Sequence, residues 1–296
     1  MGLLKICRNI LCAAMLFLLP AIPAQVFCGQ ELVYEVKNQP ARGQPLIVEI
    51  SAKTGVAYFS VEWQEKTIKA PATCNEANCT ASLILPTIYK KSGQFTILIS
   101  IDKFAPGYTG GKKSFESGTV DVLDKTYDKQ SLTVDPKYVK LSQENLDRVD
   151  EERKLISKAL ETFSSTKQWR LPLHRPHPGV ISGEFGVQRI FNNEPRNKHT
   201  GVDFAGKTGD RVFAVTDGTV ILTGEHYFAG NSVYIDHGQG VVSMYFHLSE
   251  ILLKNGDNVK AGDTVGLVGA TGRVTGPHLH FGFSAQGVSV DPVNLF

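Results

Sequence analysis

Two short motifs in the last third of the chain place residues that could bind a metal ion. KHTGVDFAG puts His199 and Asp203 at H-x-x-x-D spacing, and GPHLHFGF puts His278 and His280 one residue apart. Successive side chains of a β-strand point to opposite faces, so His278 and His280 would share a face. A catalytic zinc takes about three ligands of these types and leaves a fourth position open. The residue types therefore indicate metal-assisted hydrolysis.

Regular geometry restricts how His199 and Asp203 could meet at one ion. Four residues of extended strand cover about 13 Å, which is too far, and Gly201 makes a helix across this stretch unfavourable. His199 should therefore lie on a loop or a kinked strand end, and Gly201 permits such a bend. A third ligand could be His280.

These motifs resemble those of the LytM or lysostaphin-type zinc metallopeptidases, the M23 peptidase family. KHTGVDFAG, MYFHLS and TGRVTGPHLHF follow in the family's order, with DGTV, VKAGDTVG and GATG between them, so the resemblance covers residues 175–296. It implies that His199, Asp203 and His280 bind Zn²⁺. It also implies that His247 and His278 flank the metal and handle protons and transition-state charge.

The resemblance does not decide the roles of some other residues. Arg189 and Arg196 precede the first ligand, where the family builds a groove wall; each could bind substrate or form a structural ion pair. Gly282 departs from the glutamate that many members have at this place, which puts a substrate-orienting contact in doubt. We expect His237 in a turn or the core and His226 on the surface.

The resemblance also implies a function and a substrate. We expect a zinc metalloendopeptidase that hydrolyses the peptide cross-links between peptidoglycan stems. One alternative is a non-catalytic M23-like regulator of cell-wall amidases, but all five expected site positions are filled. Another is a biotinyl or lipoyl carrier, suggested by VKAGDTVG, but no lysine stands at the required hairpin tip.

The region before these motifs has a different pattern. Residues 30–125 alternate apolar and polar positions in short runs such as PLIVEISAK and VAYFSVEW, which is typical of a β-sandwich. This region shows no cluster of catalytic residue types, so we expect an accessory domain. Cys74 and Cys79 could close a local disulfide in an exported protein; two free thiols are the alternative.

Residues 126–170 are expected to form a linker that contains an amphipathic helix capped by Ser142. Packing within the chain is favoured over a coiled-coil dimer because the stripe is short, so we expect a monomer. The proline-rich stretch KQWRLPLHRPHPG reads as a linker with solvated His174 and His177. The apolar stripe consists of Leu146, Val149, Ile156, Leu160 and Phe163.

The first 24 residues are interpreted as a signal peptide, because Lys5 and Arg8 precede a short apolar run broken by prolines. Cleavage there removes two of the 31 basic residues and none of the 29 acidic ones, leaving a formal charge of zero. No basic footprint therefore indicates nucleic-acid binding. We expect an exported, periplasmic or extracellular protein that is mainly β: an N-terminal β-sandwich, a connecting amphipathic helix and a C-terminal β-rich LytM-type metallopeptidase domain over residues 171–296.

Overall fold

A computed structural model describes residues 25–28, 32–104, 106 and 115–296. The predicted signal peptide, residues 1–24, lies outside the described residues. Strands dominate the described chain, with one α-helix among them, so the mainly β fold class is confirmed. None of the described helices has both the length and the apolar character that crossing a membrane requires.

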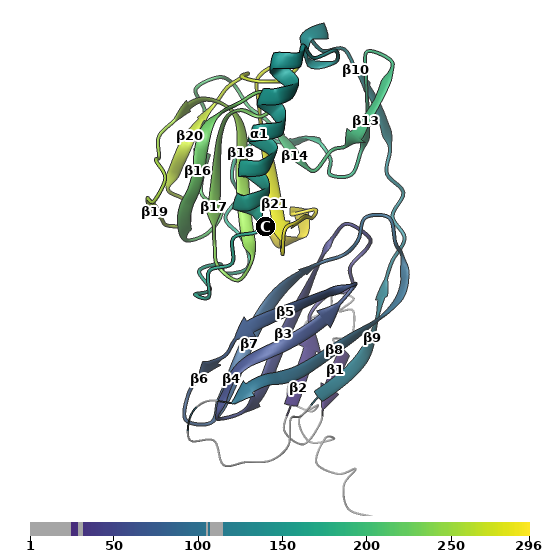
Figure 1. The fold of residues 1–296 in the computed structure, drawn as a ribbon, viewed down its shortest axis with the longest axis vertical. Coiled ribbons are helices and arrows are strands. Elements are labelled where there is room, and N and C mark those ends of the chain that lie inside the picture. The colour runs from purple at the N-terminus through teal and green to yellow at the C-terminus, as the bar shows by residue number, and fades with distance from the viewer. Residues whose placement is uncertain (1–24, 29–31, 105, 107–114) are drawn as a thin grey trace, which may run out of the picture.

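Two sheets form the N-terminal part, drawn in purple and blue in Figure 1. They bury one shared core, in which Tyr34, Phe59 and Trp63 are almost fully enclosed. Burial alternates along the strands, as the alternating sequence predicts. The first sheet contains β1 (Gln25–Cys28), β2 (Leu32–Val36), β3 (Pro45–Lys53), β7 (Asn78–Pro86) and β6 (Thr73–Cys74); the second contains β5 (Lys66–Pro71), β4 (Val56–Trp63), β8 (Gly93–Phe104) and β9 (Phe115–Val122).

A disulfide and a buried hydrogen bond stabilise the N-terminal part. Cys74 and Cys79 form the expected disulfide, which joins the short strand β6 to β7. The buried indole of Trp63 donates a hydrogen bond of 2.7 Å to the carbonyl of Pro86, on the opposite sheet. The second contact satisfies a polar group that would otherwise be costly to bury.

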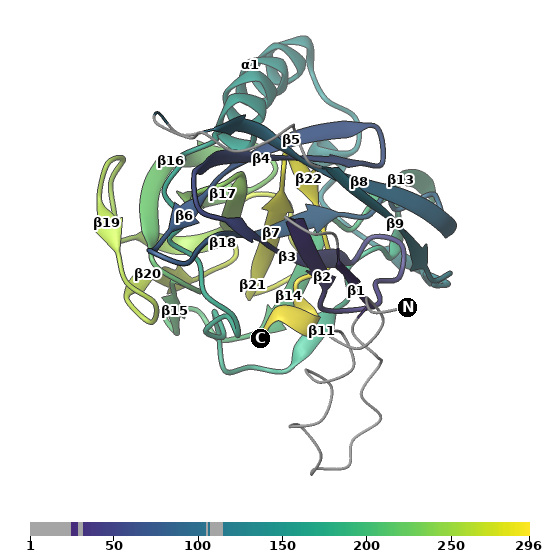
Figure 2. The ribbon, with the colours of Figure 1, turned by 90° about the horizontal axis from the view of Figure 1, so that it is seen from below.

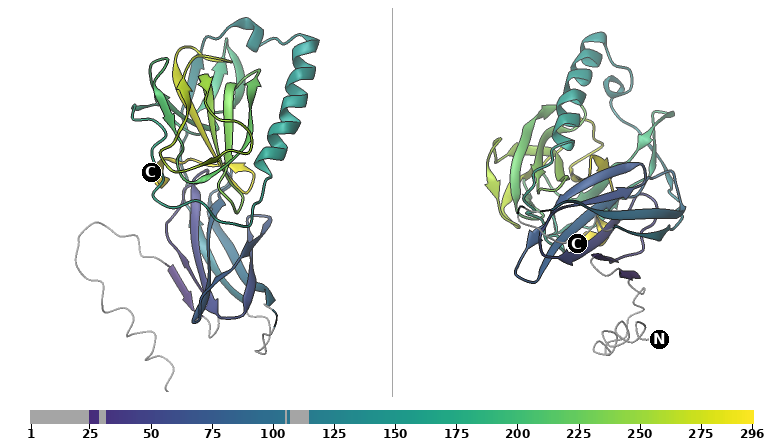
Figure 3. Two further views of the ribbon diagram at one scale, coloured as in Figure 1. Left: turned by 90° about the vertical axis from the view of Figure 1, so that its left-hand side faces the viewer. Right: turned by 60° about the horizontal axis from the view of Figure 1, so that its bottom comes forward.

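The N-terminal part is docked on the C-terminal part, and the two are stacked along the long axis of the molecule (Figures 1 and 3). Figure 2 looks along this axis, so the two parts overlap in that view. The Tyr89 hydroxyl donates to the Gly186 carbonyl, and Lys66 donates to the Gln286 carbonyl, each at 2.7 Å. Gly186 has a φ of +87°, and a Cβ there would lie 2.1 Å from the Tyr127 ring. Only glycine allows this close approach.

The connecting segment contributes a strand and a helix. Strand β10 (Lys129–Leu132) pairs in parallel with β12 (Gln188–Phe191), which pairs with β13 (Glu194–Lys198). After the 3₁₀ turn η1 (Pro136–Tyr138), helix α1 (Gln143–Leu160) runs along the side of the C-terminal sheet (Figure 3).

Helix α1 packs against its own chain, as expected. The Ser142 hydroxyl accepts a hydrogen bond from the Asn145 amide, so the predicted cap is confirmed. The burial of the stripe is only partial: Leu146 and Phe163 are each 44% exposed, and Phe163 lies beyond the helix end. The contact is made by Ile156 and Leu160, which pack against Tyr234, Val242 and Met244.

The C-terminal part is built on one large sheet that is largely antiparallel. Its core encloses the aromatic rings of Phe204, Tyr245, Phe281 and Phe283. The sheet is followed by the 3₁₀ turn η2 (Val293–Leu295). Its strands are β11 (Ile181–Gly183), β14 (Gly201–Ala205), β15 (Arg211–Phe213), β16 (Gly218–His226), β17 (Gly230–Asp236), β18 (Val241–Ile251), β19 (Asn258–Val259), β20 (Thr264–Val268), β21 (His278–Ala285) and β22 (Val288–Ser289).

Outside the motifs, the structure differs from the sequence-based expectations at three places. The proline-rich stretch is packed rather than free, since Trp169 and Leu173 belong to the C-terminal core. His177 is 3% exposed and accepts a hydrogen bond from the Gly179 amide, so the prediction of a solvated side chain is wrong. The same error holds for His226, which is buried and hydrogen bonded to Ser232.

His237 is a core residue, which is one of the two locations expected from the sequence. Its Nδ1–H donates to the Asp217 carbonyl and its Nε2 is hydrogen bonded to Ser243, each at 2.7 Å. Full burial lowers the pKa of His237 to about 4. The ring is therefore neutral in the folded protein at neutral pH.

This shift predicts a pH dependence of stability. The unfolded chain binds a proton at His237 below about pH 6.5, whereas the folded chain does so only near pH 4. The contribution of His237 to the free energy of unfolding is thus complete above about pH 6.5. As pH falls toward 4, about 3 kcal/mol of this stability is lost. In urea unfolding at stepped pH, His237→Gln should remove about one proton from the slope in this window. The same change at the exposed His174 is the matched control, and equal slopes for the His237 variant and the parent would contradict the assignment.

Candidate metal centre

Adjacent strands carry two of the three candidate ligands. Strands β14 and β21 are antiparallel, and their register places Asp203 directly opposite His280. His278 lies two residues earlier on β21 and therefore shares the face of His280. The H-x-H spacing therefore places His278 and His280 on the same face of the sheet, as the sequence predicts.

His199 reaches the same point from a break in the backbone. It lies between the end of β13 and the start of β14, outside both strands, which confirms the expected interruption. Gly201 is required here for space: a Cβ would lie 2.4 Å from the Phe281 carbonyl oxygen and 2.7 Å from Nε2 of His280. Glycine thus lets β14 lie close enough to β21 for the group to form.

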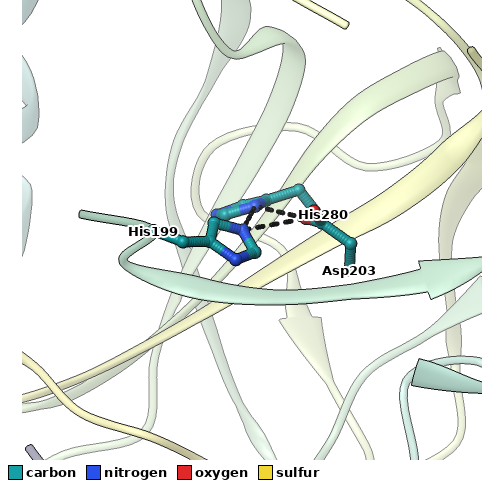
Figure 4. A group of neighbouring side chains, drawn as sticks. All are labelled: His199, Asp203 and His280. Atoms are coloured by element: carbon teal, nitrogen blue, oxygen red, sulfur yellow. Dashed lines mark hydrogen bonds and ion pairs between the residues drawn. The ribbon is translucent and has the colours of Figure 1, made fainter. Parts of the chain in front are cut away.

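The three side chains converge (Figure 4). Nε2 of His199 is 2.9 Å from Nδ1 of His280 and 3.0 Å from Oδ1 of Asp203. Nδ1 of His280 is 2.8 Å from the same carboxylate oxygen. All three residues are buried.

Counting protons shows that this group fits a cation. The other nitrogen of His199, Nδ1, lies 2.7 Å from the carbonyl of Glu184 and must donate to it, because a carbonyl only accepts. In the neutral ring, Nε2 of His199 is then a bare lone pair that faces a carboxylate oxygen and a second imidazole. At most one proton, on His280, is left for three mutual contacts. A metal ion would satisfy all three acceptor atoms together.

The electrostatics favour the metal-binding forms of these residues. Burial lowers the pKa of His280 to about 4, so its ring is neutral at neutral pH. Burial alone would raise the pKa of Asp203, but its contacts with His199 and His280 outweigh this effect and hold it well below the usual range. Metal ions bind neutral imidazole and ionised carboxylate.

Asp203 is held from its other side by an arginine. Arg189, on β12, donates a hydrogen bond of 2.6 Å to Oδ2 of Asp203. Arg189 thus forms a structural ion pair, one of the two roles that the sequence allows. Its role in substrate binding stays a prediction. Gly183, opposite Asp203 on β11, leaves room for the carboxylate, since a Cβ there would lie 2.5 Å from Oδ2.

His247 and His278 lie beside the three converging side chains. Their ring centroids are 5.0 Å apart, and that of His247 is 5.9 Å from that of His280. His247 donates through Nδ1 to the Thr271 carbonyl, and His278 donates through Nδ1 to the Gly276 carbonyl, each at 2.9 Å. Each ring therefore keeps an unprotonated Nε2 when it is neutral.

Thr271 is a positioning residue that the sequence analysis did not identify. Its carbonyl orients His247, and its hydroxyl donates to the Leu248 carbonyl and accepts from the Asn231 amide. His247 itself has a φ of +64°, a conformation that costs a non-glycine residue about 1–2 kcal/mol. The motif GATG around Thr271 is part of the family resemblance, but no spacing rule reveals its hydrogen bonds.

Two further sequence-based expectations concern the surroundings of the site. The side chain of Arg196 lies outside the described residues, so its predicted role in substrate binding stays a prediction. Gly282 on β21 lies opposite Met244 on β18, and a Cβ at Gly282 would lie 2.8 Å from the Met244 methyl carbon. A longer side chain at this position would therefore require Met244 to move.

A cleft of about 600 Å³ opens beside the three converging residues. One side is lined by His199, His247 and His280. The connecting segment also lines the cleft, through Tyr138 and residues of α1. The site thus lies in a space large enough for a peptide segment.

A β-rich fold with two histidines and one carboxylate around a metal position, beside a cleft, defines the C-terminal part as a metallopeptidase domain. That domain belongs to the M23 group: residues 197–292 match the model of "Peptidase family M23". The family resemblance seen in the sequence is therefore confirmed.

Two relatives and one solved structure support this assignment. Peptidoglycan DD-endopeptidase ShyA of Vibrio cholerae is 39% identical over 140 residues, covering 47% of this chain and 30% of the relative. Peptidoglycan DD-endopeptidase ShyB of the same organism is 45% identical over 123 residues, covering 41% and 29%. The chain thus spans less than a third of the length of either relative. A crystal structure assigned to peptidase M23 from Pseudomonas aeruginosa aligns with a TM-score of 0.63 at 28% identity, covering 87% of this chain and 95% of that one.

The convergent geometry predicts that Asp203→Ala lowers metal affinity by more than the roughly 10–100-fold typical of residues that only orient a ligand. The change removes a charged donor from a group of three. Metal content after a chelator challenge is the measurement. Glu250→Ala, at an exposed position on β18, is the control that should keep its metal. Unchanged retention in the Asp203 variant would exclude Asp203 as a ligand.

The close contact at Gly201 yields an independent prediction. Gly201→Ala should displace the His280 ring or the β21 backbone and weaken metal binding by roughly 10–100-fold. Gly276→Ala is the matched control, because a Cβ there meets nothing within 4 Å. Metal titration with a competing chelator compares the two. Equal affinities would mean that the sheet can relax around the added methyl group.

Proposed function

We propose that this chain is a zinc-dependent endopeptidase that hydrolyses peptide cross-links of bacterial peptidoglycan in cell-wall remodelling. The observation that carries the proposal is the meeting of His199, Asp203 and His280 beside the two imidazoles of His247 and His278. The substrate is supported by the relatives, which are named peptidoglycan DD-endopeptidases.

The donor set supports zinc in particular. Two imidazole nitrogens and a carboxylate oxygen are typical of catalytic zinc sites, in which one position stays open. The three ligand atoms are 2.8–3.0 Å apart, close to the roughly 3.3 Å expected around a tetrahedral ion with bonds of about 2.0–2.1 Å. When bound there, zinc would polarise the scissile carbonyl and lower the pKa of a water molecule toward about 7.

His247 and His278 would carry the protons of the reaction. Each donates its Nδ1–H to a backbone carbonyl, so each ring, when neutral, has Nε2 available to accept a proton. Burial lowers the pKa of His247 well below its usual range, which keeps this ring in the accepting form at neutral pH. An imidazolium formed in this way can then protonate the leaving amine.

We also propose that the protein acts outside the cytoplasm, in the periplasm or the extracellular space, and as a monomer. The disulfide between Cys74 and Cys79 supports an oxidising compartment. The packing of α1 on its own domain supports a monomer, since the apolar residues Ile156 and Leu160 are covered within the chain.

The proposed function is tested by incubating purified walls with the protein and identifying the released muropeptides by mass spectrometry. Cleavage of peptide cross-links that stops on chelation and returns with zinc is the expected result. A protein that binds zinc but cuts no cross-link, yet activates a wall amidase, would favour the non-catalytic regulator instead.

The roles of the two flanking histidines are tested separately. His247→Ala and His278→Ala should each lower turnover by roughly 10²–10⁴-fold, the range for losing a positioned acid or base. Both variants should keep their zinc, because His199, Asp203 and His280 are intact. Cross-link hydrolysis and zinc stoichiometry are measured on the same folded samples. Loss of zinc would make the altered residue a ligand, and unchanged turnover would remove it from the mechanism.

A further inference from the structure

The candidate ligand His199 is held by one short loop, residues 184–187, which connects β11 to β12. The ring of His199 donates through Nδ1 to the Glu184 carbonyl at 2.7 Å. On the backbone, the Gly186 amide donates to the His199 carbonyl, and the His199 amide donates to the Val187 carbonyl, each at 2.8 Å. The loop thus positions both the backbone and the ring of His199, and the bond at Nδ1 leaves Nε2 for a metal ion.

The loop is held in turn by residues that precede the C-terminal part. The Tyr89 hydroxyl, from the turn after β7, donates to the Gly186 carbonyl at 2.7 Å. Tyr127, from the connecting segment, packs on the same glycine, since a Cβ at Gly186 would lie 2.1 Å from its ring. The neighbouring Phe185 is 1% exposed, and its ring centre lies 6.5 Å from that of Tyr89 and 6.4 Å from that of Tyr127. Three aromatic rings therefore join the loop to the preceding parts of the chain.

Tyr89 also contacts the residue directly before His199. The ammonium of Lys198 lies 3.6 Å from the ring centre of Tyr89 and 5.2 Å from that of Phe185. Lys198 is half-buried, and a cation is attracted to the face of an aromatic ring more strongly where water is excluded. One tyrosine thus contacts both segments that meet at His199: the loop through its hydroxyl, and Lys198 through its ring.

The position of Tyr89 is itself fixed by close packing between the two parts of the molecule. Ile84, on β7 and shortly before Tyr89, is fully buried and belongs to the core of the C-terminal part. The same docking includes two contacts of Asp291: its amide donates to the Gly43 carbonyl at 2.8 Å, and its carboxylate accepts from Lys125 at 3.0 Å. The N-terminal part is therefore a firm support for Tyr89.

From these contacts we propose that Tyr89 is a positioning residue for His199, through which the N-terminal part raises the metal affinity of the site. The proposal rests on the proposed zinc-dependent function and assigns the N-terminal part a role in it. Only molecules whose loop holds His199 in the binding position can take up the metal, so the apparent affinity falls with the fraction of such molecules. The hydroxyl and the ring of Tyr89 stabilise this arrangement, while the ligands remain His199, Asp203 and His280.

The test measures the zinc affinity of the full-length protein by titration against a competing chelator. Tyr89→Phe removes the hydrogen bond to Gly186 and keeps the ring, so the affinity should fall by about 3–10-fold, within the range that one neutral hydrogen bond supplies. Tyr89→Ala also removes the contact with Lys198 and should lower the affinity by about 10–100-fold, the range for residues that orient a ligand. The smaller loss with phenylalanine is the partial rescue expected from the retained ring.

Lys66→Met is the matched control, because it removes another hydrogen bond between the two parts. The Lys66 ammonium donates to the Gln286 carbonyl, and Gln286 follows the last residue of β21, whereas His280 lies near the start of that strand. Lys66→Met should therefore keep the zinc affinity of the parent. The Tm of each metal-free protein is measured alongside, so that a general weakening of the docking is distinguished from a displaced His199.

The outcomes separate this inference from the function on which it rests. A parent that binds no zinc overturns the metal site and the proposed function together. A parent that binds zinc while Tyr89→Phe and Tyr89→Ala both keep its affinity overturns the role of Tyr89 and leaves the endopeptidase function intact. An equal loss of affinity in Lys66→Met overturns that role too, because weakened docking alone would then explain the result. Tyr89→Phe carries the test by itself if Tyr89→Ala does not fold.

Discussion

The buried carboxylate of Asp203 is the constraint on which the rest of the site depends. An ionised group removed from water is costly unless it is paired, and Asp203 is only 8% exposed. It has three partners: His280 on the neighbouring strand, His199 before its own strand and Arg189 on β12. The missing side chain of Gly183 leaves room for the carboxylate. The cross-strand register, the break before β14, and the small residues Gly183 and Gly201 together allow these contacts with the Asp203 carboxylate to form.

Much of the site could be predicted because its determinants are local. The alternation of a strand sets the common face of His278 and His280, and a distance argument shows that His199 must lie outside a regular strand. The mainly β character follows in the same way from alternating apolar runs. Such features depend on residues a few positions apart, and their physical rules are short-range.

The remaining features depend on contacts between distant segments. His177 and His226 have no neighbours in the sequence that signal burial, and both become buried only when the chain folds; Nε2 of His177, for example, then lies 3.7 Å from the carboxylate of Asp210. The hydrogen bond from His247 to the Thr271 carbonyl joins residues 24 positions apart. The left-handed backbone conformation of His247 is likewise not evident from its neighbours in the sequence. The proline-rich stretch gives no sign that Trp169 enters the core of the domain that follows it.

The parallel pairing of β10 with β12 has a consequence for where the working unit of this protein ends. A two-stranded ribbon is marginal in water, and a third strand both stabilises it and covers an open edge. The β12–β13 ribbon carries Arg189 and Phe191, and its third strand comes from residues 129–132, well before the stretch that matches the family. The matching segment, residues 197–292, contains neither β10 nor β12, so excising that segment alone would remove these two strands from the frame of the cleft.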